Sequence, residues 1–188
     1  MQDFKPVGDM VGYGTECLMT YDANMGVSPL YTYYVEDSGL APEGDGWYDE
    51  DGAKADVTFS SGNGCVYQSA GDPLQYSGSV PKGAIPIIDL YDGFTCIGNA
   101  SPVQKTMQDF KPIGDMVGYG TECLMTYDEN MAVSPLYTYY VEDSGLAPEG
   151  DGWYDEEGLK ADVTFEPGDG FVIQCAGDCT LEITKVID

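Results

Sequence analysis

The sequence has no histidine and no arginine, and all seven of its basic residues are lysines. Without histidine, the chain cannot build a Ser-His-Asp or Cys-His catalytic centre or a histidine-ligated zinc site. With 33 acidic residues and a formal net charge of −26, it has few groups that could neutralise phosphates. These absences exclude the common hydrolase centres and nucleic acid as a partner.

The sequence also has no apolar run long enough to cross a membrane and no stretch with the composition of a signal peptide. Anionic lipid surfaces would repel so acidic a chain. Its carboxylates suit a protein that stays hydrated in a salty or extracellular medium, and they would attract cations such as Ca²⁺. We therefore expect no membrane insertion, and Ca²⁺ is the one candidate ion.

Helical periodicity is missing as well, since no segment keeps an apolar period of 3.6 residues for three turns. Instead, short runs of aromatic and β-branched residues alternate with turn-forming residues. The clearest predicted strands are 16–22, 30–35, 55–59, 64–68 and 94–97, and short helical turns are expected at 1–4 and 107–110. With 25 glycines and 11 prolines, the chain is predicted to be all-β.

What the sequence does contain is a long internal repeat, because residues 1–59 recur without a gap as residues 107–165. Only five pairs of positions differ: Val7/Ile113, Ala23/Glu129, Gly26/Ala132, Asp51/Glu157 and Ala53/Leu159. Nearly every candidate catalytic residue therefore occurs twice. Because an enzyme needs one unique constellation, the repeat argues against an enzyme, and no catalytic residue is assigned.

The repeat also sets the expected domain boundaries. The match stays in register to Asp72 and Asp178 and then drifts, and residues 83–106 have no earlier counterpart. The sequence thus predicts two homologous units in tandem, each a β-sandwich or barrel, at residues 1–83 and 84–188. The first unit lacks its opening strand.

Three motifs carry a family resemblance. The chain contains G-F-T-C-I-G-N-A-S-P at 93–102, G-W-Y-D at 152–155 and E-P-G-D-G-F-V-I at 166–173. This order resembles the β-rich repeats of secreted bacterial surface proteins, in which G-x-x-x-I-G-N-P-x-P precedes G-W-x-D and A-P-G-x-G-F-x-V. The likeness departs at Ala100-Ser101. Since the motifs are turn and strand signatures, the resemblance implies a β fold and an extracellular or cell-surface location rather than an activity.

The densest acidic segment, residues 43–52, and its copy at 149–158 contain the candidate metal ligands. Carboxylates two residues apart on glycine-containing turns suit Ca²⁺, although the spacing matches neither an EF-hand loop nor the nonapeptide calcium repeat. The alternative is an exposed acidic hairpin whose carboxylates face water. The candidate ligands are Asp45, Asp49, Asp51, Asp151, Asp155 and Glu157.

The only two tryptophans stand in the same segments, each followed by tyrosine: Trp47-Tyr48 and Trp153-Tyr154. Such rings could form a platform on which sugar rings stack, with nearby carboxylates bonding the hydroxyl groups. The alternative is that each tryptophan anchors the core of its unit. The four aromatic residues are therefore the candidate ligand-binding residues.

Only two of the six cysteines, Cys17 and Cys123, are equivalent in the repeat, so a duplicated disulfide framework is not expected. Most of the thiols are interpreted as small buried apolar groups. The exception is the C-A-G-D-C segment, in which Cys175 and Cys179 can face each other across a tight turn. This pair is the candidate disulfide.

Together these features favour a non-catalytic structural or adhesive repeat module of a secreted or surface bacterial protein. Its expected partners are other copies of itself or other surface proteins; glycans are candidate partners if the module binds carbohydrate. Because the first unit lacks a strand, a neighbouring chain could complete it by strand addition and so build a fibre. The alternative is a carbohydrate- or calcium-binding module.

Overall fold

The structure, a computed structural model, describes residues 4–9, 11–22, 24, 26–59, 64–69, 74–76, 87–99, 101, 103–127 and 132–183. Over these residues the chain is all β, as predicted, and its helical structure is limited to three 3-10 turns: η1 (Glu36–Ser38), η2 (Met107–Asp109) and η3 (Glu142–Ser144). No helix in this part of the chain is long and apolar enough to span a membrane.

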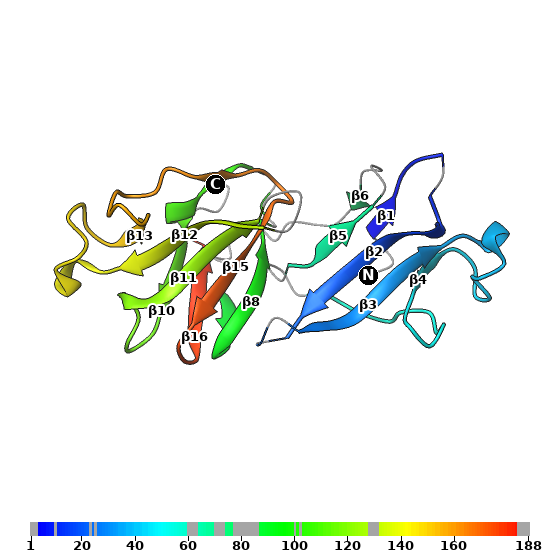
Figure 1. Ribbon diagram of the computed structural model, residues 1–188, viewed down its shortest axis with the longest axis horizontal. Helices are drawn as coiled ribbons and strands as arrows, with labels where there is room; N and C mark the ends of the chain where they lie inside the picture. The colour runs from blue at the N-terminus through cyan, green and yellow to red at the C-terminus, as the bar shows by residue number, and fades with distance from the viewer. Residues whose placement is uncertain are drawn as a thin grey trace. The chain divides into compact units, whose positions relative to one another are not determined.

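The chain divides into two compact units (Figure 1). The first comprises Met1–Asp22, Gly26–Ser60 and Cys65–Ser79, and the second comprises Ala23–Met25, Ser61–Gly64 and Val80–Asp188. None of the sheets in the described residues closes into a barrel.

The second unit contains a five-stranded and a three-stranded antiparallel sheet (Figure 1). The five-stranded sheet has the order β13 (Gly152–Tyr154), β12 (Val133–Tyr140), β11 (Tyr119–Tyr127), β15 (Gly170–Cys175) and β8 (Gly93–Gly98). The three-stranded sheet has the order β10 (Phe110–Ile113), β16 (Cys179–Ile183) and β7 (Ile87–Leu90). A two-stranded ladder joins β9 (Lys105–Thr106) to β14 (Thr164–Phe165).

The hydrophobic core of the second unit draws on both of its larger sheets. The five-stranded sheet contributes the buried residues Leu124, Trp153 and Ile173, and the three-stranded sheet contributes Phe110 and Leu181. In β7 and β10 alternate side chains are buried, as the period of two residues in a strand requires, whereas all three residues of β13 are buried. Burying each such large apolar side chain stabilises the fold by about 1.5–3 kcal/mol.

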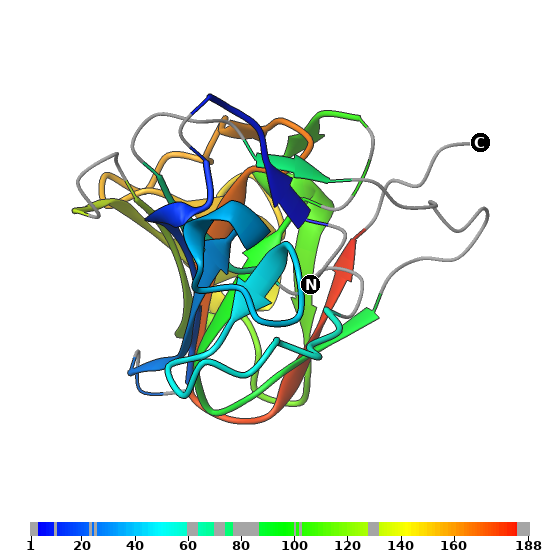
Figure 2. The ribbon, with the colours of Figure 1, turned by 90° about the vertical axis from the view of Figure 1, so that its right-hand side faces the viewer.

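The first unit, blue to cyan in Figures 1 and 2, repeats part of this architecture. Its four-stranded sheet has the order β4 (Gly46–Tyr48), β3 (Val27–Tyr34), β2 (Tyr13–Tyr21) and β5 (Val66–Gln68). A two-stranded ladder pairs β1 (Phe4–Pro6) with β6 (Leu74–Tyr76). Its core is built on Leu18, Tyr31, Tyr33, Trp47 and Ala55.

The strand registers of the two units match up to the last ladder, where the first unit is one residue shorter than the second. In the second unit Leu124 pairs with Tyr137, and in the first Leu18 pairs with Tyr31, which is the same register 106 positions earlier. The last ladder differs, because Pro6 pairs with Leu74 whereas its copy at 112 pairs with residue 181, which is 107 positions later. The drift predicted after Asp72 is therefore a single residue between β5 and β6.

The segment without an earlier counterpart forms β7, β8 and β9, all of which belong to the second unit. The strand predicted at 94–97 is confirmed as β8. The second helical turn is confirmed as η2, and most of the first lies outside the described residues. The predicted strand at 55–59 is wrong, because Thr58 and Phe59 are not in a strand, although their copies in β14 pair with β9.

Candidate functional site

The acidic hairpin of the second unit begins with β13, which pairs with β12, and then reverses direction around Asp155. Its return is marked by a bridge between Tyr154 and Lys160. The Oδ1 atom of Asp155 accepts hydrogen bonds from the backbone N–H groups of Glu157 (2.9 Å) and Leu159 (2.8 Å). The carboxylate thus holds the turn that its own backbone makes, a common role for aspartate.

The first unit builds the same hairpin with the same bonds. Asp49 Oδ1 accepts from the N–H groups of Asp51 (3.0 Å) and Ala53 (2.8 Å). The substitutions at positions 157 and 159 leave the turn unchanged because its hydrogen bonds use only their backbone. We conclude that the main role of Asp49 and Asp155 is to stabilise these turns.

Asp45 and Asp151 are used in another local contact. Asp45 Oδ1 accepts from the N–H of Glu36 at 2.7 Å, and Asp151 Oδ1 accepts from the N–H of Glu142 at 2.8 Å, so each carboxylate holds the start of a 3-10 turn. Asp151 also lies 3.7 Å from Lys111 Nζ, with both side chains 44% exposed. An ion pair this exposed contributes little stability.

The six predicted calcium ligands do not gather at one point. Asp51 and Glu157 are exposed, and the other four each use an oxygen atom to hold a turn. Among the described residues, no group of three or more His, Cys, Asp or Glu side chains could hold a metal ion. Since Ca²⁺ takes six to eight oxygen ligands, water would have to supply most of them. Calcium binding at the hairpins stays a prediction.

The four candidate sugar-stacking rings are buried, which corrects the prediction of an exposed platform. Trp47 and Trp153 have no exposed surface, and Tyr48 and Tyr154 have 1% and 0%. Each ring belongs to a short strand, β4 or β13, whose three residues are all buried. A buried ring cannot stack on a sugar, so the structure places these residues as core anchors.

The polar atoms of these buried rings are satisfied within the protein. Trp153 Nε1 donates to the carbonyl oxygen of Phe110 at 2.7 Å. The hydroxyl of Tyr154 donates to the carbonyl of Gly150 at 2.6 Å and accepts from the N–H of Glu149 at 3.1 Å. The indole thus holds the hairpin against β10, and the Tyr154 hydroxyl holds the start of the acidic segment itself.

Lys160 is a residue of this site that the sequence analysis did not identify. Its Nζ donates to the carbonyl oxygen of Glu149 at 2.8 Å and lies 6.0 Å from the centre of the Tyr154 ring. Lys54 makes the equivalent bond to the carbonyl of Glu43. The signal in the sequence was present, because each lysine stands two residues after the end of an acidic segment that contains no base. Its ammonium group closes the hairpin rather than facing a ligand.

A buried glutamate in each unit was also missed. Glu122 is 3% exposed, and its carboxylate accepts from the backbone N–H of Gly118 (2.8 Å) and from the hydroxyl of Thr121 (2.6 Å). Glu16 is fully buried and makes the same bonds to Gly12 and Thr15. Both lie where the pairing of the long hairpin shifts register, so the carboxylate replaces the missing ladder bonds.

The Ile-Gly-Asn motif has a structural role too. Asn99 is 1% exposed, and its Nδ2 donates to the carbonyl oxygens of Phe165 (2.9 Å) and Val103 (3.2 Å). Its Oδ1 accepts from the N–H of Ser101 at 3.1 Å. The side chain thus joins the end of β8 to β14. A buried amide with three such bonds has no remaining capacity for a ligand beyond one weak contact.

The thiols differ in their surroundings. Burial raises the pKa of Cys96 to about 11, and burial also raises the pKa of Cys123. The candidate disulfide pair lies at the end of β15 and the start of β16, with a distance of 2.9 Å between the Sγ atoms of Cys175 and Cys179. This pair is the one predicted group that the structure brings together.

Comparison of the chain with models of protein families, with curated proteins and with solved structures finds no match.

Proposed function

We propose that the chain is a non-catalytic structural or adhesive repeat module of a secreted or cell-surface bacterial protein. The observation that supports this is the use of its buried polar side chains. Three of the four buried polar or charged residues in the described part of the chain, Glu16, Glu122 and Asn99, hold turns or strand ends within their own unit. An active site usually contains polar groups held ready for a substrate, at a cost in stability. In this chain the three buried polar side chains stabilise the fold instead.

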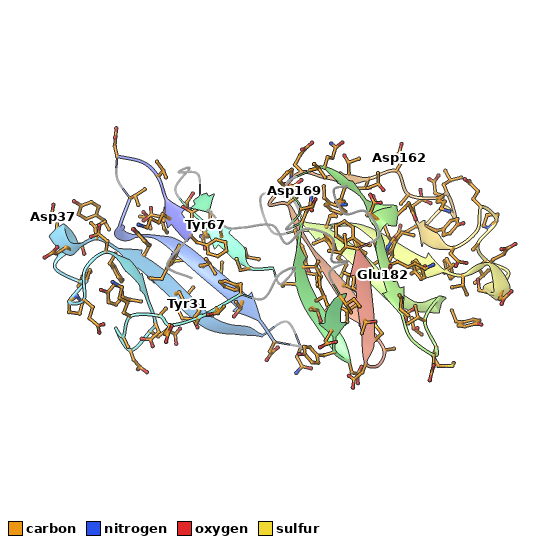
Figure 3. The ribbon with its side chains drawn as sticks, turned by 180° about the vertical axis from the view of Figure 1, so that it is seen from behind. Tyr31, Asp37, Tyr67, Asp162, Asp169 and Glu182 are labelled. Carbon is orange, nitrogen blue, oxygen red and sulfur yellow. The ribbon has the colours of Figure 1, made fainter. Side chains whose placement is uncertain are left out.

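The surface is consistent with this function. Figure 3 shows Asp37, Asp162 and Asp169 on the outside of the ribbon, and all three are exposed. With a formal net charge of −26, the repulsion between such carboxylates is large in dilute buffer and is screened beyond about 8 Å at physiological salt. A module of this kind stays hydrated in a salty medium.

Titration calorimetry with Ca²⁺ and a glycan array test the proposal against the binding-module alternative. We expect no saturable heat and no glycan signal. Saturable Ca²⁺ binding to the wild type, lost in the double variant Asp49→Asn and Asp155→Asn, would overturn it. Asparagine keeps the Oδ1 acceptor of the turn and removes only the charge, so loss of binding would not reflect loss of the hairpin.

Assembly by strand addition is the more specific form of the proposal. Its support is a difference between identical residues: Phe165 is 4% exposed in the second unit, whereas its copy Phe59 is only partly buried in the first. The second unit owes part of its cover to Ile97 of β8, which is fully buried and has no counterpart in the first repeat. A segment of the type 87–106 from another copy would supply the same cover to the first unit.

Sedimentation velocity of the full chain at rising concentration, in about 150 mM salt to screen repulsion, tests assembly. We expect larger species that dissociate when an excess of a synthetic peptide of residues 84–106 is added. A peptide of the same composition in scrambled order is the control and should have no effect. A single monomeric species at all concentrations would rule out fibre formation and leave the non-catalytic module unaffected.

A further inference from the structure

The connection between β15 and β16 carries a pair of thiols that the fold brings into contact. Cys175 is the last residue of β15, in the five-stranded sheet, and Cys179 is the first of β16, in the three-stranded sheet. Three residues separate them, and their Sγ atoms are 2.9 Å apart. The chain crosses from one sheet to the other at this point.

We propose that Cys175 and Cys179 form a reversible disulfide that locks the crossover between the two sheets of the second unit. The proposal goes beyond a structural module because it gives the unit an oxidised and a reduced state. The two thiols already meet in the reduced fold, so bond formation requires little rearrangement of the backbone.

The surroundings of the two thiols assign them different roles. Cys175 is 3% exposed and belongs to the core, whereas Cys179 is partly buried at the edge of that core. A hydrogen bond from the Cys175 thiol lowers the pKa of Cys179, and the same bond, with burial, raises the pKa of Cys175. Cys179 is therefore the thiol that ionises and is reached first, and Cys175 is the one that resolves.

The reaction with a small-molecule disulfide, such as oxidised glutathione, balances in two steps. The Cys179 thiolate attacks one sulfur of glutathione disulfide, which breaks the S–S bond, forms a mixed disulfide and releases one glutathione thiolate. That thiolate or water takes the proton of Cys175, whose sulfur attacks Cys179 and expels the second glutathione. The protein loses two electrons and two protons, and one glutathione disulfide becomes two thiols.

The first unit lacks this device and serves as an internal comparison. Ser69 stands at the position of Cys175, and the connection between β5 and β6 is one residue shorter. Apart from Cys17 and Cys65, this unit has no cysteine. The extra residue and the two cysteines therefore occur together in the second unit.

Peptide mapping of the full chain, incubated with reduced or oxidised glutathione and then alkylated, tests the proposal. Trypsin cleaves after lysine but not before proline, and the sequence has no arginine. Four cysteines therefore fall in separate peptides, and Cys175 and Cys179 share peptide 161–185. We expect oxidation to lower the mass of that peptide alone by about 2 Da, for the two hydrogens lost, and to prevent its alkylation.

Two variants test the separate roles assigned to the two thiols. In Cys179→Ser we expect no internal bond and far slower reaction of the remaining thiol with glutathione disulfide, whereas Cys175→Ser should stop at the mixed disulfide on Cys179. The variant Cys123→Ser is the matched control and should behave as the wild type. If peptide 161–185 stays fully alkylated, or if Cys175 becomes linked to the peptide that carries Cys123, the proposal is wrong.

Discussion

The indole nitrogen of Trp153 and the carbonyl oxygen of Phe110 are joined by a buried hydrogen bond of 2.7 Å that links the two sheets of the second unit. Trp153 lies in β13 of the five-stranded sheet, and Phe110 begins β10 of the three-stranded sheet. Packing alone would allow the sheets to slide, because apolar contacts have no direction. One directed bond in the middle of the core fixes how the sheets face each other.

Removing that donor should cost more in the second unit than in the first. Trp153→Phe leaves the Phe110 carbonyl buried without its partner and leaves a void, so we expect a loss of about 2–4 kcal/mol in the free energy of unfolding. Trp47→Phe breaks the equivalent bond to Phe4, which is only part-buried, so water can replace it and the loss should be smaller. Guanidinium unfolding followed by circular dichroism measures both; equal losses would contradict the difference in burial.

Replacing a glycine should cost more stability where a neighbouring side chain packs against it than at a turn with open space around it. Gly118 has φ +93°, and a Cβ atom there would lie 2.4 Å from Val141 Cγ1. We expect Gly118→Ala to lower the free energy of unfolding by about 3 kcal/mol, from backbone strain and overpacking together. Gly158→Ala, at φ +77° with open space around it, should cost only about 1 kcal/mol. Urea midpoints that coincide would argue against the clash.

The stability of the second unit should depend on the carboxylate of the buried Glu122. Glu122→Gln keeps the shape but weakens two hydrogen bonds to a carboxylate, and its amide group can place a donor against the N–H of Gly118. We expect a loss of about 1–3 kcal/mol in unfolding free energy. Glu156→Gln on the exposed hairpin is the control, with a change within about 0.5 kcal/mol. Thermal unfolding at pH 7 distinguishes them, and similar values for the two variants would show that the carboxylate bonds are unimportant.

Alkaline pH should destabilise the second unit through Cys96. Burial raises the pKa of this thiol from 9.0 to about 11, so between those values the unfolded chain has lost the proton that the folded chain keeps. Its contribution to stability is thus complete below pH 9 and is lost as the pH rises through about 11. The slope of unfolding free energy against pH should be smaller in Cys96→Ser than in the wild type; an unchanged slope would show that Cys96 ionises normally in the fold.

Much of the local structure could be predicted from residue types. The β content follows from alternating aromatic and β-branched residues, and β8 was found at 94–97 for that reason. The acidic turns follow from Asp and Gly, whose side-chain bonds and positive φ act within a few residues. The meeting of Cys175 and Cys179 follows from their spacing across a tight turn. Interactions of short range depend only on residues close together in the sequence, so sequence patterns can predict them.

Contacts between distant residues were not accessible in the same way. Trp153 was a candidate for sugar stacking because composition cannot say whether a ring faces water or a second sheet. Glu122 was missed because a glutamate in a strand is usually exposed, and its hydrogen bond to Gly118 cannot be predicted from the residue type. Both outcomes depend on which chain segments lie opposite, and that is decided by packing across the core.

The sequence by itself determined that this protein is all-β, acidic and duplicated, since those properties follow from composition, charge and the repeat. Only the tertiary structure decided what identical residues become. Thr164 and Phe165 form a strand because β9 lies beside them, whereas Thr58 and Phe59, preceded by the same four residues, do not. A strand exists through hydrogen bonds to another segment, so its formation depends on the partner as much as on its own residues.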